Sequence, residues 1–484
     1  MESCTALPIN DDVLEDIVSQ SKDFANVHGI VMRRRESPTS SELVCFTPHT
    51  LLPSPVPRKL FEEALGVQGD FNLLVHGVSR DHGFLKEAMQ DIIKEDDFNR
   101  RLFDIYEDVY IKNSPAQTIT LDMLRSDYMF DSIDDKQNEV SDVKLRQIEI
   151  NTFASGLAGL GSQATHIHRF NLENLGLSDK AAKLPDSRAV DNMAEGFVEA
   201  WRLYGNERAA IAFFIEEVSW NITDQRWLEY KIRSINKSIP IIRRTSNDFV
   251  ERAKLDHNRL IIDKYEVAIV YYRYGHDPGQ YKTEKAWEAR LMIEKSLAIK
   301  CPSVMSHLAG SKKVQQELSR PGALERFQKY FPDSAGSVQR IRNTFAGLYA
   351  LTMDKDGDAF VQEAMARPDK YVLKPQREGG GNNLFDGDVL SKLQEIGQDS
   401  RRAFYIMMDR IMPLVVKNYP IQSGRPLELK EMVSELGIFG AIISKGEEVL
   451  YNKTCGHILR TKLKSALEGS FAYGTAVIDS PYLV

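Results

Sequence analysis

The sequence predicts a mixed α/β (α+β) protein in which a small parallel α/β unit is inserted between parts built from helices and antiparallel strands. Three observations predict this class. Apolar residues recur at helical spacing through the first 110 residues, continuous apolar runs alternate with helical patterns in the middle, and strand patterns around a tight turn fill the C-terminal region. Because 484 residues exceed one ordinary core, we expect three parts, 1–208, 209–311 and 312–484.

The composition narrows the function classes. A net charge of −7 and a pI near 5.9 argue against non-specific nucleic-acid binding. No stretch approaches the roughly 20 apolar residues that span a bilayer, and the first residues lack the pattern of a signal peptide. Cys4, Cys45, Cys301 and Cys455 form no CxxC pair, which favours reduced thiols. We therefore expect a cytoplasmic protein without nucleic-acid or membrane partners.

The N-terminal part carries a first candidate site. Apolar spacing predicts helices at 11–26, 57–66 and 87–104, followed by strands at 117–121 and 144–151. In the second strand, alternation places Leu145, Ile148 and Ile150, imperfectly, on the buried side and Glu149 with Asn151 on the other. Two oxygen ligands two residues apart can reach one hard cation, although a solvated strand face is the alternative. Between the strands, 125–128 is a polar segment typical of a turn with an internal ion pair.

The middle part is the predicted parallel unit. The predicted strands span 209–215, 239–242 and 267–272, and the predicted helices span 223–235 and 284–299. In such a sheet, ligands bind beyond the strand ends, here near 216–225 and 273–281. Arg273, at the end of an apolar strand, suits the clamping of a carboxylate.

The C-terminal part carries the most specific pattern. The apolar run 371–373 leads into Lys374 and a loop with Glu378 and three consecutive glycines, Gly379–Gly381. Glycines permit positive φ and a close approach to phosphate, the lysine neutralises phosphate oxygens, and the glutamate suits magnesium. An ordinary surface turn is the alternative, and the loop is not a P-loop. Further strands are predicted at 404–407, 437–443 and 448–451.

Two basic pairs accompany this loop. Lys312 and Lys313 precede a short helix, and Arg460 and Lys462 point the same way if the chain is extended there. A solvated surface is the alternative for each pair. No kinase or hydrolase signature accompanies them, so the ATP site these groups suggest is not of the kinase type.

The chain resembles the eukaryotic glutathione synthetase family of ATP-grasp ligases. The matching segments are 125–130, 147–152, 312–322, 373–384, 434–440 and 459–462, in order, from about residue 10 to the C-terminus. The resemblance implies an ATP-grasp fold formed by 1–208, with its metal strand 144–151, and by 312–484, with a Gly-rich loop 376–386 and a C-terminal loop 464–475. The part 209–311 would bind substrate.

The implied activity is the ATP-dependent ligation of γ-glutamylcysteine to glycine through an acyl phosphate, giving glutathione, ADP and phosphate. The implied cofactor is Mg²⁺, as two ions, with ATP as co-substrate, and the implied assembly is a homodimer. Three alternatives stay open: another acceptor such as β-alanine or serine, a non-catalytic nucleotide-binding homologue, and a phosphotransferase, for which no general base is evident.

The resemblance also implies site residues. Metal ligands would be Glu149, Asn151 and Glu378. Arg125 and Arg460 would be catalytic. Nucleotide binding would fall to Glu149, Lys312, Lys374, Gln376, Arg377, Glu378, Gly379, Gly380, Gly381, Asn382, Asn383, Phe385, Met408, Asp409, Arg410, Ile411, Glu435, Lys462 and Glu468. Substrate binding would fall to Arg125, Ser155, Ser219, Trp220, Asn221, Gln225, Arg273, His276, Arg460, Phe471 and Ala472.

Several of these positions depart from the family pattern. They are Phe153-Ala154, where a further serine is usual, Ser219-Trp220, where an acidic-basic pair is common, and His276, Phe385, Glu468 and Phe471-Ala472. None of them removes an expected metal ligand or phosphate cation.

Overall fold

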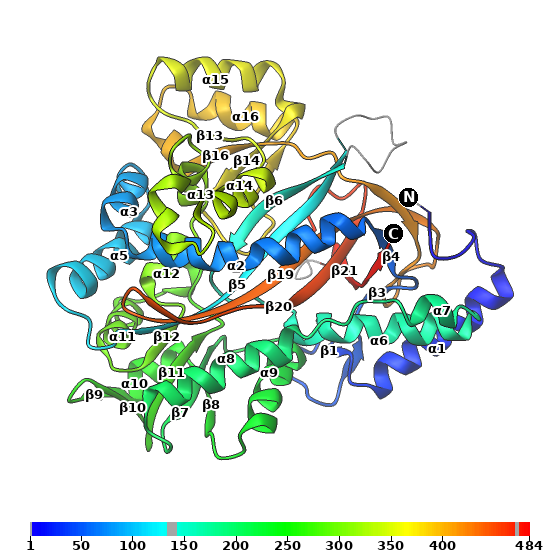
Figure 1. Cartoon of the computed structure of the whole chain (residues 1–484), viewed down its shortest axis with the longest axis horizontal. Coiled ribbons are helices and arrows are strands. Elements are labelled where there is room, and N and C mark those ends of the chain that lie inside the picture. Colours follow the sequence, from blue (N-terminus) through cyan, green and yellow to red (C-terminus); the bar gives the residue numbers. More distant parts are fainter. Residues whose placement is uncertain (1, 133–142, 470–473) are drawn as a thin grey trace.

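The computed structural model describes residues 2–132, 143–469 and 474–484 and confirms the mixed α/β class, with helices packed on several sheets (Figure 1). The largest sheet has the order β18-β3-β21-β20-β19-β5-β6, with β17 pairing with β19. Its strands are β3 (His49–Thr50), β5 (Ile119–Ser132), β6 (Val143–Asn151), β17 (Val415–Asn418), β18 (Pro420–Ile421), β19 (Lys430–Lys445), β20 (Glu448–Leu463) and β21 (Ala476–Asp479). Strands from both ends of the sequence therefore build one sheet.

Helices cover both faces of this central sheet (Figure 1). Alternate residues of β19 pack on opposite sides, as a strand's period of two requires. Leu436 and Ile438 join a core with α2 (Arg58–Arg80), whereas Phe439 and Ala441 join a core with α6 (Ala158–Asn174) and α8 (Ala189–Tyr204). The antiparallel hairpin predicted near the C-terminus is confirmed, and its strands are longer than expected.

The N-terminal helices differ from the prediction in length. The helix predicted at 11–26 is α1 (Asp11–Val27), but that predicted at 57–66 continues to Arg80, because burial of nearly every residue from Phe71 onward outweighs the glycines within it. The predicted helix 87–104 is divided into α3 (His82–Met89), α4 (Ile92–Glu95) and α5 (Asp97–Tyr106). Asp96 caps α5 by accepting a hydrogen bond from the backbone N–H of Asn99, which starts a new helix.

The predicted parallel unit is confirmed and carries an antiparallel addition. Strands β8 (Ile241–Thr245), β7 (Ala210–Ile215), β11 (Tyr265–Tyr272) and β12 (Ile299–Cys301) pair in parallel, with α9 (Ile222–Ile235), α10 (Ser246–Arg252) and α11 (Glu284–Lys295) beside them. Strands β9 (Ala253–Asp256) and β10 (Arg259–Ile262) extend the sheet antiparallel to β11. The helix predicted to reach 299 ends at Lys295, since Ile299 belongs to β12.

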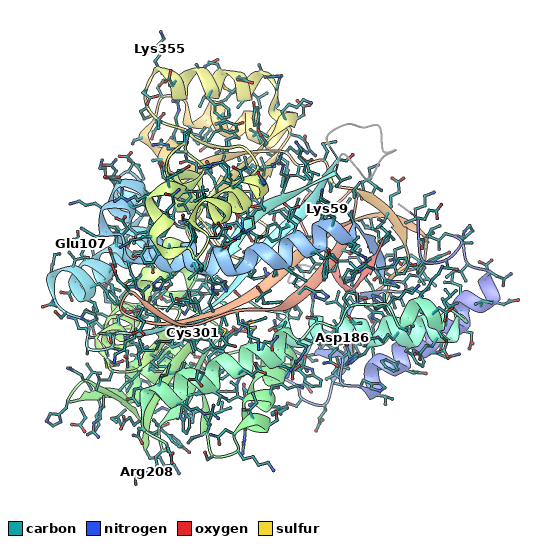
Figure 2. All side chains as sticks on the ribbon, viewed as in Figure 1. Lys59, Glu107, Asp186, Arg208, Cys301 and Lys355 are labelled. Atoms are coloured by element: carbon teal, nitrogen blue, oxygen red, sulfur yellow. The ribbon has the colours of Figure 1, made fainter. Side chains whose placement is uncertain are left out.

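A smaller sheet, β13-β16-β14-β15, lies against the other end of the central sheet, at the top of Figure 1. Its strands are β13 (Leu348–Ala350), β14 (Tyr371–Pro375), β15 (Leu384–Phe385) and β16 (Tyr405–Asp409), covered by α15 (Lys355–Ala366) and α16 (Gly387–Ile396). Figure 2 shows Arg208, before β7, and Lys355, in α15, projecting from opposite ends of the molecule, while Cys301 lies inside.

The remaining elements connect these layers. They include the ribbon of β1 (Val31–Arg33) and β2 (Val44–Phe46), the pair of β4 (Ser54–Val56) and β22 (Pro481–Leu483), and the helices α7 (Ser178–Ala181), α12 (Val304–Ala309), α13 (Lys312–Leu318) and α14 (Ser334–Thr344), with a π-helix, η1 (Glu107–Lys112). Among the residues with a described structure, no helix combines the length and apolar character needed to cross a membrane. The division at 208/209 and 311/312 stays a prediction.

Candidate active site

A cavity of about 940 Å³ lies where the three main sheets meet. Its walls come from β5, β6, β19 and β20 of the central sheet, from β14 and β16 of the small sheet, and from residues after β7 and β11. The last of these is the carboxyl end of the parallel strands, where such sheets bind ligands. Segments far apart in the sequence thus contribute to one site.

Most of the predicted site residues line this cavity. They are Arg125, Glu149, Asn151, Trp220, Asn221, Gln225, Arg273, His276, Lys312, Lys374, Arg377, Glu378, Gly379, Gly380, Asn382, Asn383, Phe385, Met408, Asp409, Arg410, Ile411, Glu435, Arg460, Lys462 and Glu468. Ser155, Ser219 and Gln376 are buried and lie behind the wall, whereas Gly381 is exposed in the Gly-rich loop and does not line the cavity. Phe471 and Ala472 fall outside the described residues.

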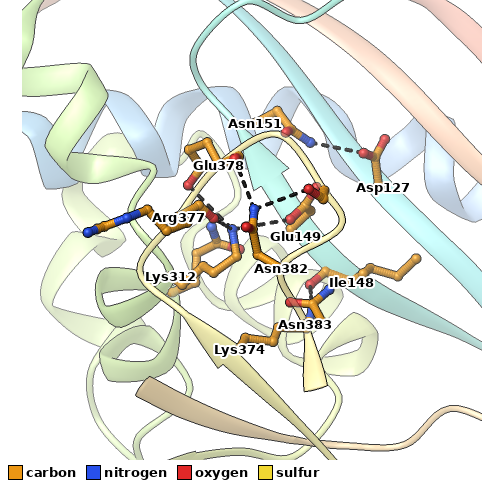
Figure 3. Close-up of polar contacts among 12 residues, drawn as sticks. Asp127, Ile148, Glu149, Asn151, Lys312, Lys374, Arg377, Glu378, Asn382 and Asn383 are labelled. Atoms are coloured by element: carbon orange, nitrogen blue, oxygen red, sulfur yellow. Dashed lines mark hydrogen bonds and ion pairs between the residues drawn. The ribbon is translucent and has the colours of Figure 1, made fainter. Parts of the chain in front are cut away.

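Two carboxylates converge on one buried lysine (Figure 3). Lys312, the first residue of α13, places its Nζ 3.6 Å from Glu149 Oε2 on β6 and 3.4 Å from Glu378 Oε1 in the Gly-rich loop. Burial favours a raised pKa for Glu149, but nearby cations, Lys312 foremost, lower that pKa to about 2. Burial, with the charge of Glu149, raises the pKa of Glu378 despite Lys312. Two carboxylates that share one lysine could also hold a further cation.

Asn151 presents an oxygen to the same place. Its Nδ2 donates to Asp127 Oδ2 at 2.9 Å, so the side-chain carbonyl is turned the other way. Within the described part of the chain, that carbonyl accepts no hydrogen bond. Glu149, Asn151 and Glu378 therefore fit the oxygen ligand set that Mg²⁺ prefers.

A β-bulge explains the imperfect alternation of β6. Asp127 pairs with Glu149 and the next residue, Tyr128, with Gln147, so Ile148 has no partner of its own. The bulge turns Ile148 into the cavity wall, contrary to the prediction that it lies on the buried side with Ile150. Its backbone carbonyl accepts a hydrogen bond from Lys374 Nζ at 3.0 Å.

Two further lysines are buried beside the cavity. Burial lowers the pKa of Lys374, on β14, to about 8, and it does the same to Lys462, on β20. Lys462 Nζ donates to the carbonyls of Ala466 and Leu467 at 2.6 and 2.7 Å. With Lys312, these amino groups form three positive charges around one cavity, an arrangement suited to a polyphosphate.

Two arginines are held by one buried carboxylate. Asp127 accepts hydrogen bonds from Arg125 Nε and Nη2 at 2.6 and 2.8 Å and from Arg460 Nη2 at 3.0 Å. Arg460 also pairs with Glu435 on β19. The segment 125–128 was predicted as a turn, but it lies within β5, and the expected internal ion pair is present. Paired guanidinium groups at a cavity suit a carboxylate or an oxyanion.

Arg273 and His276 lie at the substrate-facing edge of the cavity. Arg273 Nη1 donates to Tyr271 Oη at 3.2 Å, but its buried Nε has no partner among the described residues. The buried Nδ1 of His276 likewise has none there, and burial lowers the pKa of His276 to about 4. His276 is therefore neutral near pH 7. The ring of Phe153 packs between those of His276 and His307.

The Gly-rich loop has the backbone that three glycines predict. Gly379, Gly380 and Gly381 all have positive φ, between 70° and 98°. Glu468, from the C-terminal loop, accepts hydrogen bonds from the backbone N–H groups of Gly381 and, at 2.7 Å, Asn383. The two backbone amides therefore bind an anionic group, here the Glu468 carboxylate, as the amides of a phosphate-binding loop bind phosphate.

Comparisons with known proteins agree with this geometry. The family model for the eukaryotic glutathione synthase ATP-binding domain matches residues 11–483. The chain belongs to the eukaryotic glutathione synthetase family. It is 45% identical to the glutathione synthetase of Xenopus laevis over 473 residues, covering 98% of this chain and 97% of the relative. It is 43% identical to the glutathione synthetase of Homo sapiens, with 97% of each chain covered. A glutathione synthetase-like effector of Globodera pallida, solved in its apo form, superposes with a TM-score of 0.77 at 27% identity, covering 99% of this chain and 98% of the effector.

Two features of this glutathione synthetase family member were missed by the sequence reasoning. Asp127 lies between the two predicted catalytic arginines, and its position two residues from Arg125 on a strand was a usable signal. Asp224 caps the N-terminus of α6 by accepting hydrogen bonds from the backbone N–H groups of Leu157, Gly159 and Leu160, at 2.8, 2.9 and 3.1 Å. No local sequence pattern predicts this capping by Asp224, since residues 157–160 and Asp224 are far apart in the sequence.

Proposed function

We propose that this chain ligates γ-glutamylcysteine to glycine at the expense of ATP, through an acyl phosphate, to give glutathione, ADP and phosphate. The observation that carries the proposal is the convergence of Glu149 and Glu378, three buried lysines and the Arg125–Asp127–Arg460 cluster on one cavity. Membership of the eukaryotic glutathione synthetase family supports the choice of substrates.

The chain's own groups fit the chemistry. A carboxylate becomes a good electrophile only after a phosphate leaving group is attached, and both reactants are anionic. Lys312, Lys374 and Lys462 would neutralise the phosphates. Arg125 and Arg460 would hold the reacting carboxylate and then the oxyanion that forms when the glycine amine attacks. The cavity would shield the acyl phosphate from water.

The metal and nucleotide assignments belong to the same proposal. Glu149, Asn151 and Glu378 would hold two Mg²⁺ ions, which neutralise phosphate charge when bound. The adenine and ribose would lie against Met408 to Ile411 and Glu435. The dipeptide would contact the wall formed by Trp220, Asn221, Gln225, Arg273 and His276. We further propose a cytoplasmic homodimer, as the family resemblance implies; native mass measurement tests the assembly.

The test is ADP release that requires γ-glutamylcysteine and glycine together. Glu378→Ala should abolish turnover and leave the thermal midpoint unchanged, because the side chain is partly exposed and serves the cavity rather than the core. Glu395→Ala, an exposed glutamate on α16, is the control and should keep full activity. Activity in Glu378→Ala would refute the metal assignment, and equal rates with β-alanine would refute glycine as the acceptor.

A further inference from the structure

A chain of hydrogen bonds runs behind the substrate wall, through residues that mostly do not touch the cavity. Its members are Glu229, Arg243, Gln225, Ser219 and Asn221, which we call the amide relay. Arg243 on β8 pairs with Glu229 on α9 and donates from Nη2 to Gln225 Oε1 at 2.7 Å. Gln225 Nε2 is 3.0 Å from Ser219 Oγ, and that oxygen is 3.0 Å from Asn221 Oδ1.

The direction of the bonds from Gln225 to Asn221 follows from Arg243. A guanidinium group has donors only, so Gln225 must offer its oxygen to Arg243. The amide nitrogen of Gln225 then faces Ser219 and donates to it. Having accepted that bond, the Ser219 hydroxyl is free to give its single proton to Asn221 Oδ1.

The relay thereby fixes which end of Asn221 faces the cavity. Asn221 lines the cavity, and in the described part of the chain its Nδ2 makes no hydrogen bond. With its oxygen held by Ser219, the side chain presents an N–H donor. Arg273 lines the same cavity, and of its two terminal guanidinium nitrogens only Nη1 makes a hydrogen bond among the described residues, to Tyr271 Oη. The amide N–H of Asn221 and the guanidinium of Arg273 are both donors, and the amide oxygen of Asn221 is already bonded to Ser219, so the pair suits a carboxylate of the ligand.

We propose that Ser219 is a positioning residue: by accepting a hydrogen bond from Gln225 and donating one to Asn221, it makes Asn221 present its N–H donor, and not its oxygen, to the dipeptide. The guanidinium of Arg243, which can only donate, sets the direction of these bonds. Ser219 was expected to bind substrate directly, but it lies behind the wall and is buried. Its effect on the substrate is therefore indirect. The proposal rests on the proposed function, because the carboxylate in question is that of γ-glutamylcysteine.

The first measurement is steady-state kinetics of Ser219→Ala. Without the hydroxyl, Asn221 can rotate its amide, so the KM for γ-glutamylcysteine should rise about tenfold, the equivalent of about 1.4 kcal/mol. The kcat and the KM for ATP should stay within about twofold, because no relay member bonds to Lys312, Lys374 or Lys462 in the described structure. Ser234→Ala is the matched control and should behave as wild type, because Ser234 is exposed near the end of α9 and its hydroxyl donates, among the described residues, only to Lys231 O.

A double-mutant cycle separates positioning from general structure. If Ser219 acts through Asn221, the double variant Ser219→Ala/Asn221→Ala should have the same KM as Asn221→Ala alone. Additive effects, an unchanged KM in Ser219→Ala, or an equal rise in the KM for ATP would each overturn the proposal. Should Ser219→Ala fail to fold, Ser219→Cys keeps the volume with a weaker donor and should raise the same KM about threefold; an unchanged KM there would overturn it too. Wild-type protein that releases no ADP with γ-glutamylcysteine and glycine would instead refute the proposed function.

Discussion

Replacing Asp127 by asparagine should damage both stability and activity. The carboxylate is fully buried and accepts three bonds from two guanidinium groups, at 2.6, 2.8 and 3.0 Å. Asparagine has nearly the same shape but only one acceptor oxygen and no charge. Removing one partner of a buried ion pair costs about 3–5 kcal/mol, because the remaining charges are left uncompensated. For a chain of this length, about 4 kcal/mol corresponds to a fall in Tm of about 4 °C.

In Asp127→Asn, kcat/KM should fall by more than the loss of folding stability alone would cause. Arg125 and Arg460 would lose their common anchor, and the loss of one aligned oxyanion donor typically costs about 100-fold in rate. We therefore expect Asp127→Asn to lower kcat/KM for the dipeptide about 100-fold while the protein stays folded at 25 °C, as checked by calorimetry and kinetics.

Asp122→Asn is the matched control. Asp122 is buried in the same strand, makes no ion pair among the described residues, and burial raises its pKa to about 6. Its substitution should cost about 1 kcal/mol or less. The reasoning is refuted if Asp127→Asn keeps the wild-type Tm and kcat/KM, or if Asp122→Asn loses as much.

Two further predictions concern the nucleotide side. The affinity for a non-hydrolysable ATP analogue should fall between pH 7 and pH 9 by up to about tenfold for each of Lys374 and Lys462, because these lysines, with pKa values of about 8, bind phosphate as cations below that pH and lose the proton above it. Calorimetric titration should show a smaller fall in Lys374→Arg, which stays charged, and an undiminished fall would contradict the assignment. Glu468→Gln should speed hydrogen exchange at the amides of Gly381 and Asn383 about tenfold, since one charge-assisted acceptor is lost, whereas the exposed Glu431→Gln should leave exchange there unchanged. Equal exchange in the two variants would show that Glu468 does not hold the loop.

Local patterns predicted the fold class and much of the cavity wall. The hairpin of β19 and β20 and the parallel strands β7 and β11 follow from apolar runs and turns, and the positive φ values of Gly379–Gly381 follow from composition. These features depend on neighbours in the sequence, which a single sequence displays.

The missed features depend on residues that are distant in the sequence. The length of α2 reflects burial by other layers, and the bulge at Ile148 reflects the register between β5 and β6. The role of Asp127 between two strands and that of Ser219 behind the wall also need the assembled sheet. In each case tertiary packing outweighed or redirected a local preference.

The central sheet has a consequence for how the protein is made. Strand β5 pairs with β19, so that Ile119 lies opposite Lys445. At a synthesis rate of roughly 5–20 residues per second, the ribosome needs about 15–60 s to deliver the partner strand. During that interval the edge of β5 that pairs with β19 in the folded protein has no partner strand, and such an edge can pair with other chains. We therefore expect aggregation of newly made chains to rise when translation slows before residue 430.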